Sequence, residues 1–187
     1  MNVICDTAII ANFLKINRID LLARSSHTFL VCDLVQQEIA VEYPGQLKCF
    51  QKALKKSAIQ KVAALDSQEL DLFSELIKEG QLSPCECATL AIAAYRGYFL
   101  ASDDSQATLQ AELLMAPNRI LRTQNIVVAM IKENLLSEDS ADQLLLSWAA
   151  YLRFKLKPST IEMFPEDNLL QETSLQWGIF PLVLKSG

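Results

Sequence analysis

Short apolar runs alternate with stretches of helical spacing along most of the chain. Four runs predict β-strands, at residues 2–5, 29–32, 98–101 and 119–121. Between them, apolar residues recur three and four positions apart, the pattern of an amphipathic helix. Regular alternation of strand and helix predicts an α/β fold, with a central parallel sheet between two helical layers in a three-layer α/β/α arrangement.

Start and stop signals divide the helical stretches. Asp6 and Asp33 stand where N-caps are expected, and Gly80 and Gly97 where helices end. Ser-x-x-Glu or Asp-x-x-Glu patterns, typical of capping boxes, begin at Asp66 and at Ser83. The predicted helices begin near residues 7, 19, 34, 84, 105, 124 and 138, and helical spacing also covers 46–80.

The C-terminal part differs from the rest. Residues 1–135 hold the alternating pattern and form the predicted main domain. Residues 136–187 predict one more helix, to about residue 156, followed by a proline-containing irregular extension. We expect this region to pack on the same domain or on a partner.

Carboxylates follow the predicted strands or begin helices near them. Asp6 follows the first strand, Asp103 and Asp104 follow the third, and Glu38 and Glu86 lie near helix starts. Because the carboxyl ends of parallel strands share one edge, these side chains can meet in one cleft. Several carboxylates in one cleft repel each other unless a cation lies among them, and a hard divalent ion suits oxygen ligands.

Each acid also has a structural explanation. Asp6 can cap a helix, Glu86 can complete the box with Ser83, and Glu38 can be an exposed helix residue. One of the two adjacent aspartates can cap a helix, which leaves the other in need of a cation or solvent. The joint order of the acids, rather than any one of them, predicts a metal site.

Composition narrows the class of protein. Of the 187 residues, 51% are hydrophobic, which is enough for a packed core, and no apolar run is long enough to span a bilayer. The net charge of −5 argues against a surface that wraps nucleic acid broadly, although a local basic rim can still bind a phosphodiester. Five cysteines, an odd number, and the absence of a signal-like N-terminus predict a reduced, cytoplasmic protein.

The ordered set of motifs resembles the PIN-domain family of metal-dependent ribonucleases, in particular its small prokaryotic branch that includes toxins of toxin–antitoxin pairs. The resemblance covers roughly residues 1–135. It lies in the segments VICDT at 3–7, LKINRIDLL at 14–22, VCDLVQQEI at 31–39, LSPCE at 82–86 and LASDD at 100–104.

The resemblance implies a site and an activity. Asp6, Glu38, Glu86 and Asp103 would be the catalytic acids and metal ligands, with Asp104 as an auxiliary or water-mediated ligand. The implied reaction is hydrolysis of RNA by one or two Mg²⁺ or Mn²⁺ ions, with a homodimer and an antitoxin protein as expected partners. Hard oxygen ligands suit these ions, whereas Zn²⁺ prefers His or Cys and the chain has one His, His27. The alternative is a PIN-fold interaction or regulatory module without catalysis.

Two positions depart from the pattern of that branch. Cys85 stands where the branch usually has Gly, and Thr108 stands where it often has Arg after the paired acids. The second departure removes an expected contact to phosphate or to a helix. It therefore affects the expected substrate binding more than the expected metal binding.

Overall fold

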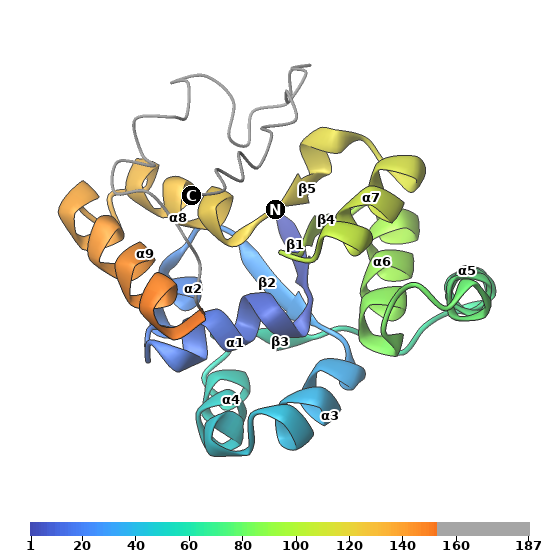
Figure 1. Cartoon of the computed structure of the whole chain (residues 1–187), viewed down its shortest axis with the longest axis horizontal. Helices are drawn as coiled ribbons and strands as arrows, with labels where there is room; N and C mark the ends of the chain where they lie inside the picture. Colours follow the sequence, from blue (N-terminus) through green and yellow to red (C-terminus); the bar gives the residue numbers. More distant parts are fainter. Residues whose placement is uncertain (153–187) are drawn as a thin grey trace, which may run out of the picture.

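The computed structural model describes residues 1–152, without the side chains of 145 and 148–152. Strands and helices alternate through this part of the chain (Figure 1). The elements are β1 (Asn2–Cys5), α1 (Thr7–Lys15), α2 (Asp20–Arg24), β2 (Thr28–Val31), α3 (Asp33–Glu42), η1 (Pro44–Gln46), α4 (Leu47–Lys55), β3 (Gln60–Lys61), α5 (Ser67–Glu79), α6 (Pro84–Arg96), β4 (Phe99–Ala101), α7 (Ser105–Leu114), η2 (Pro117–Arg119), β5 (Ile120–Leu121), α8 (Thr123–Lys132) and α9 (Glu138–Leu152).

The five strands form one parallel sheet in the order β3-β2-β1-β4-β5. The first strand is therefore central, and its register sets Ile4 beside Leu30 on one side and beside Leu100 on the other. All four pairings between neighbouring strands are parallel, so the carboxyl ends of all five strands lie at the same edge of the sheet. Strand order reverses beside β1, which is where ligands bind in open sheets of this kind.

Helices cover both faces of the sheet, which confirms the predicted α/β class. Helices α6 and α7 lie on one side and α1, α2 and α8 on the other (Figure 1). The three central strands, β2, β1 and β4, are mostly apolar and mostly buried because helices cover them on both sides. The core joins residues of the sheet to the inner faces of these helices, and its largest side chains include Phe13, Phe50 and Leu90.

Most helix boundaries follow the predicted signals. Asp6 caps α1, and both capping boxes form, at Asp66 with Glu69 and at Ser83 with Glu86. Gly80 and Gly97 end their helices in the left-handed region, at φ values of 69° and 68°, which a residue with a side chain adopts only with strain.

Two local predictions are wrong. Residues 46–80 were expected to be helical, but they contain β3, whose two exposed residues pair with Leu30 and Val31 at the sheet edge. A two-residue polar strand has no periodicity of its own, so only its pairing with β2 defines it. Asp33 does not cap α3. The N-cap is Cys32, and the Asp33 carboxylate instead accepts a bond from Lys61 Nζ at 2.8 Å.

Helix α5 is held to α6 by a buried ion pair. The Glu69 side chain is fully buried, and its Oε1 lies 2.5 Å from Arg96 Nε. Arg96 Nη2 donates to Glu69 Oε2 and to the carbonyls of Ala63 and Ala64. Arg96 thus joins α6 to α5 and to the segment before it.

The predicted C-terminal helix is present as α9, and Ala141 and Leu144 on it belong to the core. The predicted irregular extension lies outside the described residues. Within residues 1–152, no helix combines the length and apolar composition needed to cross a membrane.

Candidate functional site

The sheet brings two of the predicted acids together where β1 and β4 end. Cys5 and Ala101 are paired in the sheet, and the amide of Asp6 donates to the carbonyl of Ala101 at 3.0 Å. Asp103 lies two residues beyond Ala101. Asp6 and Asp103 therefore follow neighbouring parallel strands that end at one level.

Asp6 is the most deeply buried of the predicted acids, with 3% of its surface exposed. Its Oδ1 accepts from the Ile9 amide at 2.9 Å, while its buried Oδ2 has no hydrogen-bond partner among the described residues. The pKa of Asp6 is raised to about 7, chiefly by burial, and the charges of Asp103 and Glu86 contribute to this rise. The Ile9 amide and the nearby Ser102 hydroxyl oppose this rise. A buried carboxylate oxygen without a donor is costly unless another group binds it.

Asp103 is held by three donors from α1 and α8. Its Oδ2 accepts from Asn12 Nδ2 at 3.0 Å and from the Thr123 hydroxyl at 2.6 Å, and its Oδ1 accepts from the Thr123 amide at 2.9 Å. Asn12 Nδ2 also lies 3.1 Å from the Thr123 hydroxyl oxygen. These bonds fix the orientation of the carboxylate and leave lone pairs available chiefly on Oδ1.

Asp104 and Glu86 both serve as helix caps. Oδ1 of Asp104 accepts from the amides of Gln106 and Ala107 at 2.7 and 2.9 Å, so the second aspartate of the pair caps α7. Glu86 Oε2 accepts from the Ser83 amide at 2.7 Å within its capping box. Burial raises the pKa of Glu86, and the charges of Asp104 and Glu38 add to this effect while the bonds from Ser83 oppose it.

Glu38 lies further from the group. It is half-buried on α3, and no hydrogen bond or ion pair involves it among the described residues. Its charge nevertheless reaches Glu86, and together with Glu42 and Asp6 it adds to the effect of burial in raising the pKa of Tyr43. Glu38 therefore belongs to the electrostatic surroundings of the acids without touching them.

These five residues form a group by charge rather than by contact. In the part of the chain that the structure describes, no three His, Cys, Asp or Glu side chains lie close enough to hold a metal ion as they stand. Asp103, Asp104 and Glu86 each bond to protein donors instead. We call Asp6, Glu38, Glu86, Asp103 and Asp104 the acidic group below.

Three polar residues around Asp103 were not predicted: Asn12, Thr123 and Arg122. Asn12 is 5% exposed, and a buried amide among Ile9, Ile10 and Phe13 was a signal in the sequence. Thr123 follows β5 as Asp103 follows β4, so its position at a strand end was a second signal. Arg122 donates from Nη1 to the Asp103 carbonyl and from Nη2 to the Thr108 hydroxyl, both at 3.1 Å.

The two departures from the family pattern have structural counterparts. Cys85 is buried, and its Sγ lies 3.3 Å from the Thr7 hydroxyl, so it fills the contact between the starts of α6 and α1. Thr108 brings no positive charge, but it accepts the bond from Arg122. A guanidinium is thus present beside Asp103, from the N-cap residue of α8 rather than from α7.

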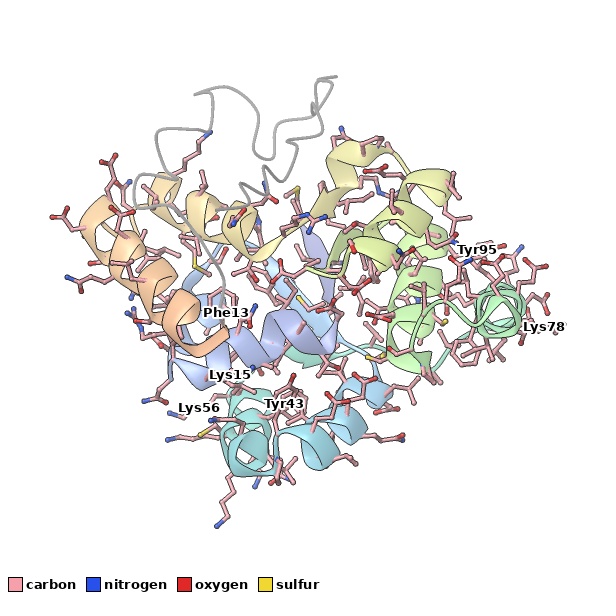
Figure 2. The ribbon with its side chains drawn as sticks, viewed as in Figure 1. Phe13, Lys15, Tyr43, Lys56, Lys78 and Tyr95 are labelled. Atoms are coloured by element: carbon pink, nitrogen blue, oxygen red, sulfur yellow. The ribbon has the colours of Figure 1, made fainter. Side chains whose placement is uncertain are left out.

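A second cation lies where α1 and α3 end. Lys15 Nζ stands 4.7 Å from the centre of the Tyr43 ring, and the two side chains lie together in Figure 2. Burial lowers the pKa of Lys15. This cation–π contact ties the end of α1 to the end of α3, which carries Glu38.

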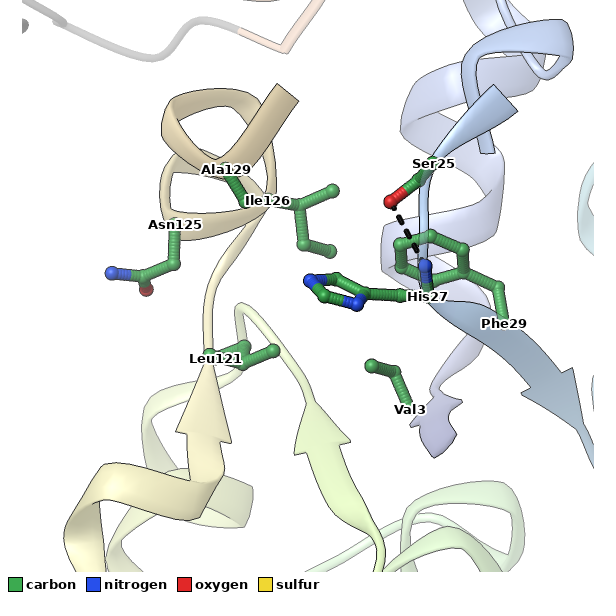
Figure 3. Close-up of a pocket in the computed structure, with 8 residues that line it drawn as sticks. All are labelled: Val3, Ser25, His27, Phe29, Leu121, Asn125, Ile126 and Ala129. Carbon is green, nitrogen blue, oxygen red and sulfur yellow. Dashed lines mark hydrogen bonds between the residues drawn. The ribbon is translucent and has the colours of Figure 1, made fainter. Parts of the chain in front are cut away.

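A small pocket elsewhere in the domain contains none of the acids. Figure 3 shows His27 projecting between Ile126 of α8 and Val3 of β1, with Phe29 and Leu121 completing an apolar wall. Among residues 1–152, buried His27 Nε2 has no hydrogen-bond partner, and it lies 3.7 Å from Glu133 Oε1. Most of the pocket lining is apolar, and its polar residues are Ser25, His27 and Asn125, without a carboxylate among them.

A family model described as a PIN domain matches residues 2–163. The chain belongs to the PIN-domain family. The match includes β1 through α9 and therefore extends beyond residue 135, where the resemblance recognised in the sequence ended. No curated protein sequence matches the chain. Membership in this PIN-domain family accords with the parallel sheet and with the acids that follow β1 and β4.

Proposed function

We propose that this PIN-domain protein is a metal-dependent ribonuclease that hydrolyses RNA phosphodiester bonds with Mg²⁺ or Mn²⁺. The observation that carries the proposal is the buried Oδ2 of Asp6, which no described donor satisfies. It lies in an acidic group at the end of the central strands, and Asp103 and Glu86 raise its pKa in addition to burial. A cation bound there would satisfy the oxygen and offset the repulsion.

The donor set fits a hard divalent ion. Asp6 and Asp103 would hold it, with Glu86, Glu38 and Asp104 contributing directly or through water. All of these ligands are carboxylate oxygens, which suit Mg²⁺ and Mn²⁺. When bound, such an ion lowers the pKa of a coordinated water and stabilises the charge that grows on the phosphate.

The protein's own residues prepare the site for this role. The Ile9 amide holds one oxygen of Asp6 and so directs the other away from the cap. Asn12 and Thr123 fix the Asp103 carboxylate from two different helices. Outer-shell hydrogen bonds of this kind orient metal-binding carboxylates. Glu86 can join only if its Oε2 exchanges the Ser83 amide for the ion or if Oε1 binds it.

The test combines Mn²⁺ titration by calorimetry with cleavage of a single-stranded RNA, for wild type and for D6N. We expect wild type to bind Mn²⁺ and cleave, and D6N to lose metal affinity by more than about 100-fold and to lose cleavage. D66N is the matched control, because Asp66 caps α5 as Asp6 caps α1, and Asn caps equally well. Absence of Mn²⁺ binding by wild type at millimolar concentration would overturn the proposal.

A second candidate function is a PIN-fold interaction or regulatory module without catalysis. The observation that favours it is that four of the five acids, all except Glu38, already accept hydrogen bonds from protein donors and that no three of the described acids are positioned for one ion. This candidate predicts that Mn²⁺ binds neither wild type nor any variant and that RNA stays intact.

The ribonuclease proposal includes the partners expected from the family: RNA as substrate, a small antitoxin protein, and a second copy of the chain. Exposed leucines on α7, Leu109 and Leu113, are 56% and 79% exposed and offer apolar surface for protein contacts. Sedimentation equilibrium of the full chain tests the dimer. If the chain sediments as a single monomeric species over a 100-fold range of protein concentration, the homodimer is removed from the proposal.

A further inference from the structure

Arg122 stands beside the acidic group on a rigid support. Its own amide donates to Asn125 Oδ1 at 2.8 Å, and the next residue, Thr123, contacts the Asp103 carboxylate through both its amide and its hydroxyl. The guanidinium then turns back to the Asp103 carbonyl and to Thr108. Both the backbone and the side chain of Arg122 are therefore anchored, and Arg122 adjoins Thr123, which binds the Asp103 carboxylate.

The charge of Arg122 is not neutralised by this arrangement. Its two acceptors are a carbonyl and a hydroxyl, and no carboxylate of the described residues forms an ion pair with it. Arg96 and Arg18, by contrast, pair with Glu69 and Asp20. Arg122 is also exposed. A guanidinium carries five N–H donors, and two of them bond to described residues, so donors remain for a ligand on the solvent side.

We propose that Arg122 binds a phosphate group of the RNA backbone next to the acidic group, an inference that rests on the proposed ribonuclease function. A chain with a net charge of −5 and a cluster of carboxylates repels a polyanion on approach. An exposed, oriented guanidinium beside Asp103 supplies the opposite charge at that place. Its planar donors match two phosphate oxygens, which a lysine ammonium does not do.

A purely structural role for Arg122 makes a different prediction. The guanidinium connects the end of β4 to α7 and α8, so it could serve only to hold these elements together. In that case, removal of the Thr108 hydroxyl would lower RNA affinity as much as removal of the Arg122 charge does. T108V therefore separates the two roles, because it deletes one acceptor and keeps the arginine.

The experiment measures binding of a fluorescent single-stranded RNA to the full chain by anisotropy, with Ca²⁺ present, at several salt concentrations. We expect R122Q to bind about 10-fold more weakly than wild type and to lower the slope of log affinity against log salt by about 0.7, the value for one phosphate contact. T108V should keep most of the affinity. R24Q is the matched control, since Arg24 is an exposed arginine on α2 and its loss changes the net charge equally.

Two measurements keep the inference separate from the proposed function. Mn²⁺ affinity by calorimetry should be the same in R122Q and wild type within about twofold, because the guanidinium binds phosphate rather than metal. R122M is a second uncharged variant in case R122Q does not fold. Equal RNA affinity and equal salt slope in wild type, R24Q and the folded uncharged variant would overturn the inference, whether or not Mn²⁺ binds. If wild type does not bind Mn²⁺, the proposed function is overturned instead.

Discussion

The capping boxes of α5 and α6 have the same local geometry and opposite electrostatics. In each, a glutamate oxygen accepts from the N-cap amide, at 2.9 Å for Glu69 and 2.7 Å for Glu86. The hydrogen-bonded Arg96 guanidinium lowers the pKa of Glu69, whereas burial raises the pKa of Glu86. Helix α6 creates both situations, because its last residue is Arg96 and its first turn carries Glu86.

The difference teaches that a motif determines the position of a carboxylate but not its chemistry. The Glu69 carboxylate is paired with the Arg96 guanidinium of the same protein, so Glu69 contributes to the stability of the fold. Glu86, like Asp6, lies in a group whose described members have no such cation paired to them. A cation from outside is the simplest complement, and the comparison can be tested by changing the charge on either side.

The largest effect is expected from the acid without a cation, Asp6, in metal-free protein. An aspartate with a pKa of about 7 when folded and about 3.9 when unfolded costs about 4 kcal/mol of stability once both states are ionised. The folded state binds the extra proton, so stability falls as pH rises from about 4 to about 7 and then stays constant. In urea unfolding with EDTA, the free energy of unfolding of D6N relative to wild type should increase as pH rises from about 4 to about 7.

D66N is again the control and should follow wild type at every pH. Parallel stability curves for D6N and wild type would show that burial of Asp6 carries no such cost. Added Mn²⁺ should reduce the advantage of D6N, because a cation at Asp6 favours the ionised form.

The next effect concerns the acid with a cation. R96M should lower the free energy of unfolding by about 3 kcal/mol, because it leaves the fully buried Glu69 carboxylate without its partner. Guanidinium chloride is unsuitable for this measurement because it screens charge, so unfolding is followed in urea. E69Q/R96M should recover part of the loss. A double variant no more stable than R96M would argue that packing, not charge, holds α5 to α6.

Removal of the caps should cost less and should separate the two boxes by their response to metal. D66A and S83A should each lose about 1 kcal/mol of stability, the usual cost of an N-cap. Only S83A should change Mn²⁺ affinity, upwards. It keeps the Ser83 amide that donates to Glu86 Oε2 but removes the hydroxyl that accepts from the Glu86 amide, so the helix turn that fixes Glu86 is held less firmly. Thermal unfolding with and without Mn²⁺ measures both quantities. Equal metal responses in S83A and D66A would contradict a role for Glu86 at the ion.

The smallest effect is expected for E86Q. Glutamine keeps the capping box, and the substitution removes a charge near Asp104 and Glu38, so metal-free stability at pH 7.5 should rise by about 0.5 kcal/mol. The same change at Glu69 should lower stability, since Arg96 would then lack its partner. Opposite signs for E86Q and E69Q in urea unfolding are the expected result, and equal signs would remove the distinction between the two boxes.

Much of the fold could be predicted because local signals and tertiary structure agree. The apolar runs at residues 2–5, 29–32 and 98–101 had to be buried on both faces, which only a parallel sheet under helices allows. Capping residues marked α1, α5 and α6 because orphan amides at a helix start need an acceptor. Strand β3 escaped prediction because its two exposed residues, Gln60 and Lys61, are in the sheet only through their pairing with β2.

The candidate site was predictable in its acids and not in their partners. Asp6 and Asp103 follow adjacent strands, so topology brings them together. Which donors hold Asp103 depends on how α1 and α8 lie over the sheet, and no spacing in the sequence relates Asn12 to Thr123. The same limit applies to Arg122, since its contact with Thr108 joins the N-cap of α8 to α7.

The central place of β1 has a consequence for how the protein is made. The ribosome synthesises β1 before the other described strands, yet one of its two neighbours, β4, ends at residue 101, and the donors that hold Asp103 continue to residue 123. Nascent chains shorter than this contain Asp6 without its companions. If the protein cleaves RNA, the growing polypeptide stays harmless to the messenger and ribosome producing it until Asp103 and Thr123 have emerged.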